Sequence, residues 1–166
     1  MSLYEIPLVL RADLRAILAE SLTPTRVSER KKSIILQHAT STNLRGVMCT
    51  AFQPGAYFRP HKHLVRESFL PIQGEMQLNF LLRDENGPYT QTHQLTGAMR
   101  EWIVVPAGVD HTLQATGEDS AVYSIFHDVY DEATYKEELE NSPPETAEEE
   151  VIAEYLRTIF SDPRPF

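Results

Sequence analysis

The sequence lacks most features of secreted and membrane-embedded proteins. It contains one cysteine, Cys49, so no internal disulfide can form, and the position of Cys49 in the apolar run 47–52 predicts a buried thiol rather than a nucleophile. No apolar stretch approaches the ~20 residues needed to cross a bilayer. The N-terminus contains Glu5 and has no basic-then-apolar signal pattern. We therefore expect a cytoplasmic protein with no membrane partner.

Positive charge is also scarce, and the shortage is local. The net charge is -9, and residues 131–154 contain ten acidic residues against Lys136 alone. Because negative charge repels phosphate backbones, we expect no nucleic-acid partner. The acidic run itself is typical of a solvated helix face. The length of 166 residues is enough for one domain with its own hydrophobic core.

Hydrophobic periodicity predicts a central β domain between two helical segments. Apolar residues recur at helical spacing over residues 11–20, which predicts a short amphipathic helix within an N-terminal segment 1–25. A β-barrel domain is expected over residues 26–130, because short β-branched and aromatic runs alternate there with turn signals. The expected strands are residues 33–38, 44–52, 57–63, 67–73, 75–82, 89–95, 101–105, 112–116 and 121–130.

No further strand is expected after Tyr130, in the acidic C-terminal segment 131–166. Ser142, Pro143 and Glu145 have the order of an N-cap, a first-turn proline and a capping glutamate, so they predict the start of a helix. This helix would have one apolar stripe, made of Val151, Ile152, Tyr155, Leu156 and Ile159. The stripe must be covered by the barrel or by a second subunit.

Two distant stretches contain a candidate metal site. On a strand, alternate residues share a face, so His61 and His63 point the same way, with Glu67 four residues further on. His111 follows the turn at Pro106 to Gly108 and supplies a fourth donor. Three neutral imidazoles and one carboxylate suit a divalent first-row metal, and zinc, iron, manganese, nickel and cobalt all accept this set. Four protein ligands leave two positions of an octahedral ion for water or a ligand.

These stretches resemble the two cupin motifs. The first motif, a glycine, five residues, His-x-His, three or four residues, Glu, six residues and a glycine, matches from Gly55 to Gly74. The second matches at Pro106, Gly108 and His111, but Arg100 replaces its leading glycine and Ala115 its frequent asparagine. The string around Arg59-Pro60, with a basic stretch at 26–32, is similar to the small bacterial WbuC-type cupin metalloproteins over residues 26–130.

The resemblance implies a fold and a setting. It implies an all-β, cupin-type double-stranded β-helix, a jelly-roll barrel, here with a short N-terminal helix and C-terminal helices. The WbuC-type family is associated with bacterial polysaccharide or O-antigen gene clusters. Cupin barrels commonly pair through edge strands, and the apolar helix stripes need cover, so we expect a homodimer.

Further polar residues are candidates for ligand contacts. Period-two alternation places Tyr57 and Arg59 on the face of His61 and His63. Arg59 is a candidate holder of an anionic ligand, with a salt bridge at the barrel rim as the alternative, and Tyr57 is a candidate for proton transfer. His93, Gln77 and Asn79 lie on two strands joined by one turn. They form either a polar wall of the cavity or ordinary surface.

The predicted function is a metal-binding barrel that holds a small anionic or sugar-like ligand. As an enzyme it would be a sugar-modifying isomerase, epimerase or lyase, or with iron a dioxygenase. The alternative is a non-catalytic module that binds or senses a sugar. A catalyst would turn over a sugar phosphate or a nucleotide-linked keto-sugar, whereas a sensor would return it unchanged.

Overall fold

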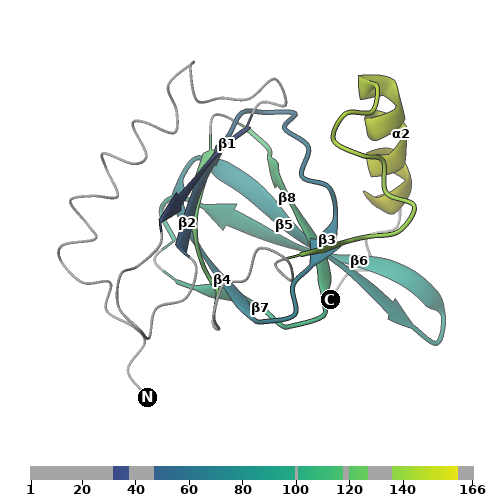
Figure 1. Cartoon of the computed structure of the whole chain (residues 1–166), viewed down its shortest axis with the longest axis horizontal. Helices are drawn as coiled ribbons and strands as arrows, with labels where there is room; N and C mark the ends of the chain where they lie inside the picture. The colour runs from purple at the N-terminus through teal and green to yellow at the C-terminus, as the bar shows by residue number, and fades with distance from the viewer. Residues whose placement is uncertain (1–31, 38–46, 100, 118–119, 127–135, 161–166) are drawn as a thin grey trace.

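The computed structural model describes residues 32–37, 47–99, 101–117, 120–126 and 136–160 (Figure 1). The predicted helix over 11–20 and Arg100 lie outside this part of the chain. So does the side chain of Cys49, whose backbone lies in a strand. Within these ranges, no helix combines the length and apolarity that a membrane span requires.

The described residues form two five-stranded antiparallel sheets (Figure 1). The first has the order β1-β2-β9-β4-β7 and the second the order β10-β3-β8-β5-β6. The strands are β1 (Lys32–Gln37), β2 (Val47–Phe52), β3 (His61–Lys62), β4 (Glu67–Gln73), β5 (Glu75–Asp84), β6 (Gly87–Thr96), β7 (Ile103–Val105), β8 (Asp110–Ala115), β9 (Ser120–Phe126) and β10 (Glu137–Glu138). Sequence-distant strands pair in both sheets, as in a jelly roll, so the predicted all-β class is confirmed.

The expectation that no strand follows Tyr130 was wrong. β10 pairs with β3, with Glu138 opposite His61 and Glu137 opposite Lys62. The expected strand over 57–63 shrinks to the two residues of β3, because Pro60 has no N–H to give to a ladder. The N–H of Leu139 instead donates to the carbonyl of Pro60 at 2.8 Å, so the C-terminal segment supplies the edge of the second sheet.

The C-terminal helix begins later than the sequence predicted. Helix α2 spans Glu149–Phe160, and the carbonyl of Glu148 accepts from the N–H groups of Val151 and Ile152. Ser142 does not cap a helix, because its hydroxyl donates to the carbonyl of Leu139 at 2.6 Å and closes a turn. Two glutamates in the first turn of α2 suit the positive end of its dipole.

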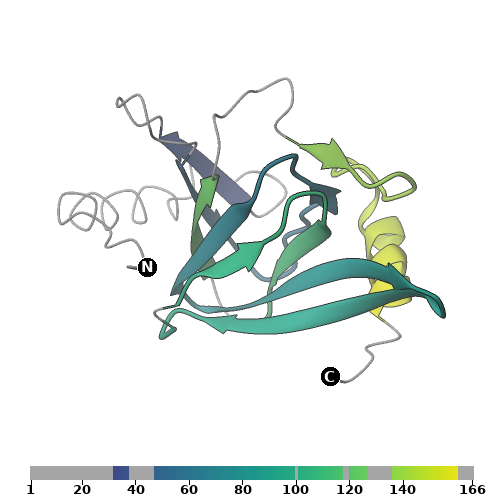
Figure 2. The same cartoon turned by 90° about the horizontal axis from the view of Figure 1, so that it is seen from below.

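The apolar stripe of α2 is largely covered by the same chain. Ile152 is buried, and Tyr155, Leu156 and Ile159 are partly buried, whereas Val151 is 52% exposed. The helix lies beside β6 (Figure 2), where the hydroxyl of Thr90 donates to the carbonyl of Ile159 at 2.7 Å. The barrel therefore supplies most of the cover that the stripe requires.

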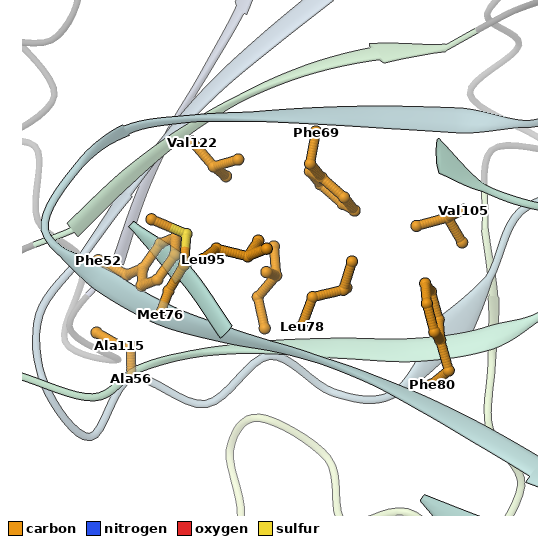
Figure 3. Packing of buried hydrophobic residues seen from close by; sticks show 11 residues of the cluster. Phe52, Ala56, Phe69, Met76, Leu78, Phe80, Leu95, Val105, Ala115 and Val122 are labelled. Carbon is orange, nitrogen blue, oxygen red and sulfur yellow. The ribbon is translucent and has the colours of Figure 1, made fainter. Parts of the chain in front are cut away.

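The hydrophobic core lies between the sheets (Figure 3). Its buried members are Phe52, Ala56, Phe69, Met76, Leu78, Phe80, Leu95, Val105, Leu113, Ala115 and Val122. Phe80 and Val105 lie at the opposite end of this cluster from Phe52 and Ala115. Phe80 is directly opposite His111, and Val105 is directly opposite Glu67. The apolar core therefore gives way to ionisable side chains at this one end.

Candidate metal centre

The structure brings the four predicted metal ligands together. His61 on β3 is directly opposite His111 on β8, and Glu67 opens β4 in the other sheet. The ligand nitrogens of His61, His63 and His111 all lie within 4.8 Å of one another. The Oε2 atom of Glu67 lies 3.2 Å from Nε2 of His63 and 3.3 Å from Nε2 of His111. Both sheets thus contribute to one cluster, although its strands are far apart in sequence.

Backbone carbonyls fix the tautomers of two of these rings. The Nδ1 atom of His61 lies 2.8 Å from the carbonyl oxygen of Arg59, and that of His111 lies 3.0 Å from the carbonyl oxygen of Val109. A carbonyl can only accept, so each Nδ1 carries the proton and donates it. In a neutral imidazole the lone pair is then on Nε2. The nitrogens that face the cluster are therefore the ones that can bind a cation.

The cluster combines the neutral imidazole of His61 with an ionised carboxylate. Burial, followed by the neighbouring His111, lowers the pKa of His61 to about 3, so this ring is neutral at pH 7. Burial by itself raises the pKa of Glu67, but His111 and His63 beside it outweigh that effect and lower the pKa to about 2. A negative charge is therefore held in a group that is only 2% exposed.

Two atoms of the cluster are buried without a hydrogen bond. Among the described residues, Oε2 of Glu67 and Nε2 of His111 find no hydrogen-bond partner, although they lie 3.3 Å apart. A buried polar atom in this state is costly, more so when it carries charge. Convergent lone pairs that do not satisfy one another fit a shared cation, so the donor set suits a divalent metal.

Aromatic rings surround the imidazoles. The ring of Phe126 lies 4.9 Å from that of His63, and the ring of Phe69 lies 6.0 Å from that of His111. These contacts restrict ring rotation and exclude water from the inner side of the cluster. Restricted rotation and low water access both strengthen binding of an ion.

Tyr57 and Arg59 contact the C-terminal segment. The hydroxyl of Tyr57 donates to the carbonyl of Pro143 at 3.0 Å. Arg59 donates to the Ser142 hydroxyl at 2.9 Å and to the Ser142 carbonyl at 3.1 Å, and it forms an ion pair with Glu138. Arg59 therefore forms a salt bridge, which the sequence analysis gave as the alternative to holding an anionic ligand.

Period-two alternation applies only inside a regular strand, so it does not by itself fix the faces of these two positions. β3 contains neither residue. Burial, followed by the nearby Tyr155, raises the pKa of Tyr57, so its hydroxyl stays protonated and donates. The proposed catalytic roles of Tyr57 and Arg59 remain predictions. Sequence reasoning missed their partner segment, whose signal was the acidic pair Glu137 and Glu138, which form ion pairs with Lys62 and Arg59.

His93, Gln77 and Asn79 do not form one wall. His93 is directly opposite Leu78 and packs its ring 5.2 Å from that of Phe80, so it shares the inner face. Gln77 and Asn79 alternate with Leu78 and point to the other face. There Asn79 is fully buried and its side-chain oxygen accepts from Thr92 at 2.8 Å. The polar residue beside His93 on the inner face is Gln91. The two are two positions apart on β6, so strand alternation could have placed them on the same face.

Comparison with solved structures identifies the fold. Oxalate oxidase in complex with the substrate analogue glycolate is 18% identical over 61% of this chain and 53% of its own, with a TM-score of 0.53. Peruvianin-I, described as a cysteine peptidase from Thevetia peruviana latex, is 14% identical over 70% of this chain and 72% of its own, with a TM-score of 0.57. The capsular polysaccharide assembling protein CapF from Staphylococcus aureus is 18% identical over 82% of this chain and 39% of its own, with a TM-score of 0.53.

The chain therefore has the cupin fold, as its two motifs predicted. It spans only about half of the oxalate oxidase chain. Such low identities establish the fold and leave the activity open. Residues 14–95, just under half of the chain, match the family model described as a domain of unknown function, DUF6016. No curated protein sequence matches significantly.

Proposed function

We propose that this chain is a metal-binding cupin that holds a divalent cation through His61, His63, His111 and Glu67 and binds a small polar ligand there. The observation that carries the proposal is the pair of buried atoms, Oε2 of Glu67 and Nε2 of His111, that converge without a hydrogen bond. Zinc, iron, manganese, nickel and cobalt all fit this donor set.

When bound, such an ion would supply Lewis acidity toward a carbonyl or an enediolate. The residues of the chain have distinct parts in this proposal. Glu67 supplies the negative charge, and the carbonyls of Arg59 and Val109 keep the protons on the far side of two rings. Phe69 and Phe126 exclude water from the inner side of the site. Sugar isomerisation, epimerisation or a lyase reaction is the proposed chemistry, with an iron-dependent dioxygenase as an alternative.

A place in bacterial polysaccharide metabolism, as in WbuC-type cupins, belongs to the same proposal. CapF, described as a capsular polysaccharide assembling protein, has a similar fold over 82% of this chain. This likeness at 18% identity supports the barrel, while the setting rests on the sequence resemblance. A homodimer in the cytoplasm is also proposed, and sedimentation at micromolar concentration would test the dimer.

A second candidate is a non-catalytic sugar-binding module. The observation in its favour is that Tyr57 and Arg59 are held by Pro143, Ser142 and Glu138. A tyrosine with a raised pKa exchanges its proton poorly near neutral pH. Incubation of the metal-loaded protein with a sugar phosphate or a nucleotide-linked keto-sugar separates the candidates, because an enzyme converts the compound and a sensor returns it unchanged.

Metal content tests the proposal that both candidates share. The protein saturated with cobalt or zinc and then desalted should retain one ion per chain by native mass spectrometry. His111→Ala should lose it, because it removes one of the converging donors. Asp110→Asn is the matched control, since Asp110 is the adjacent residue and lies on the opposite face of β8. Retention of the ion by His111→Ala, or equal loss in both variants, would contradict the proposed centre.

A further inference from the structure

The inner face of the second sheet continues beyond the candidate metal centre. His61 is directly opposite His111, His111 opposite Phe80, and Phe80 opposite Gln91. These four residues form one row across β3, β8, β5 and β6. Because neighbouring strands lie about 4.8 Å apart, the backbones at His111 and Gln91 are separated by roughly 10 Å. This separation is within the length of one small molecule.

Gln91 and His93 form a polar pair at the β6 end of this row. The side-chain nitrogen of Gln91 lies 3.0 Å from Nε2 of His93. An amide nitrogen can only donate, so Nε2 of His93 accepts this hydrogen bond. The ring of His93 packs edge-on, 5.2 Å from that of Phe80. The pair is thus positioned by the residue that separates it from His111.

This polar pair interrupts an apolar face. Leu78 and Leu95, which neighbour His93 on that face, are fully buried, whereas Gln91 and His93 are partly exposed. Apolar side chains at the two positions would extend the core and add favourable burial. Two hydrogen-bonding side chains there instead leave the face accessible to a polar solute. A use in ligand binding accounts for both their polarity and their exposure.

We propose that Gln91 and His93 are a specificity-determining wall that hydrogen-bonds the neutral, hydroxyl-bearing part of a ligand bound at the metal centre. This inference rests on the proposed function. The pair contains no lysine, arginine or carboxylate, so it suits hydroxyl or carbonyl groups rather than phosphate. Arg59, the cation that the sequence suggested for an anionic ligand, is paired with Glu138.

The class of ligand follows from the order of groups along the row. The metal end suits a carboxylate, and Gln91 with His93, beyond the buried ring of Phe80, suits sugar hydroxyls. A sugar acid presents a carboxylate at one end and hydroxyls further along. The sequence predicted a ligand that is anionic or sugar-like. The inferred ligand is both, with its negative charge at the metal centre and its hydroxyl groups at β6.

Two probes separate the wall from the metal centre. Glycolate carries a chelating carboxylate without a sugar ring, whereas glucuronate carries a carboxylate on a pyranose ring. Both are titrated against the cobalt-loaded protein and followed by the cobalt absorption spectrum. Two added hydrogen bonds predict that glucuronate binds about tenfold more tightly than glycolate. Gln91→Met and His93→Phe keep similar side-chain volumes, and each should reduce this preference while leaving the glycolate affinity unchanged.

Gln94→Met is the matched control, because Gln94 lies on the same strand, is exposed and faces away from the core. It should keep the full preference for glucuronate. Equal affinities of the native protein for both probes would overturn the wall alone, as would a preference that survives in both wall variants. Failure of the native protein to bind cobalt or glycolate would overturn the proposed function together with the wall. Either wall variant is sufficient for the test if the other does not fold.

Discussion

Acidification should destabilise the metal-free protein through His61. Its pKa is lowered from 6.5 to about 3 in the folded state, so the fold favours the neutral ring. Stability from this group is therefore full above pH 6.5 and is lost as the pH falls toward 3. Between pH 7 and pH 5 the free energy of unfolding should fall by about 2 kcal/mol from this group alone.

Urea unfolding in the presence of a chelator at the two pH values measures this loss. Glu67 also has a lowered pKa, but its ordinary value is 4.5, so it contributes only about 0.2 kcal/mol in this window. The His61→Asn variant lacks the titrating ring but keeps all other titrating groups. The difference between the two proteins therefore isolates the contribution of His61. The variant should lose about 2 kcal/mol less than the native protein over the same interval. Equal losses in both proteins would refute the reasoning.

Three further substitutions test the packing around the site. Leu78→Ala removes a fully buried side chain and should cost about 2–5 kcal/mol of unfolding free energy, and a loss below about 1 kcal/mol in urea would contradict the core assignment. Gly97→Ala places a Cβ 2.7 Å from the Cα of Gln73, so its thermal midpoint should fall well below that of Gly117→Ala, whose nearest contact would be 3.6 Å. Ser142→Ala should cost about 1 kcal/mol and accelerate amide exchange at β10, and unchanged exchange would argue against its role.

The donor set of the candidate centre could be predicted from the sequence because residue type and spacing agreed. His61, His63, Glu67 and His111 were selected from two motifs that are separated in the chain, and β3, β8 and β4 bring them together. The β class was predictable for the same reason, since short β-branched runs alternate with turn residues. In both cases the signal lies within a short stretch of sequence.

Features that depend on pairing with a distant partner were not predictable. Glu137 and Glu138 have weak strand propensity and no alternation, so β10 exists only because β3 offers an edge next to Pro60. The face of His93 was also undecided, because the sequence does not show where period two begins on β6. Its register opposite Leu78 settles that face.

The C-terminal segment supports the strand that carries His61. β3 is two residues long and meets β8 at the single register pair of His61 and His111. So short a strand is held weakly by one neighbour, and β10 supplies the second. Arg59, whose carbonyl accepts from His61, is in turn held by Ser142. Hydrogen bonds thus connect the C-terminal segment to the imidazole of His61. A change that loosens this segment should therefore lower the metal affinity of the proposed site more than it lowers the stability of the core.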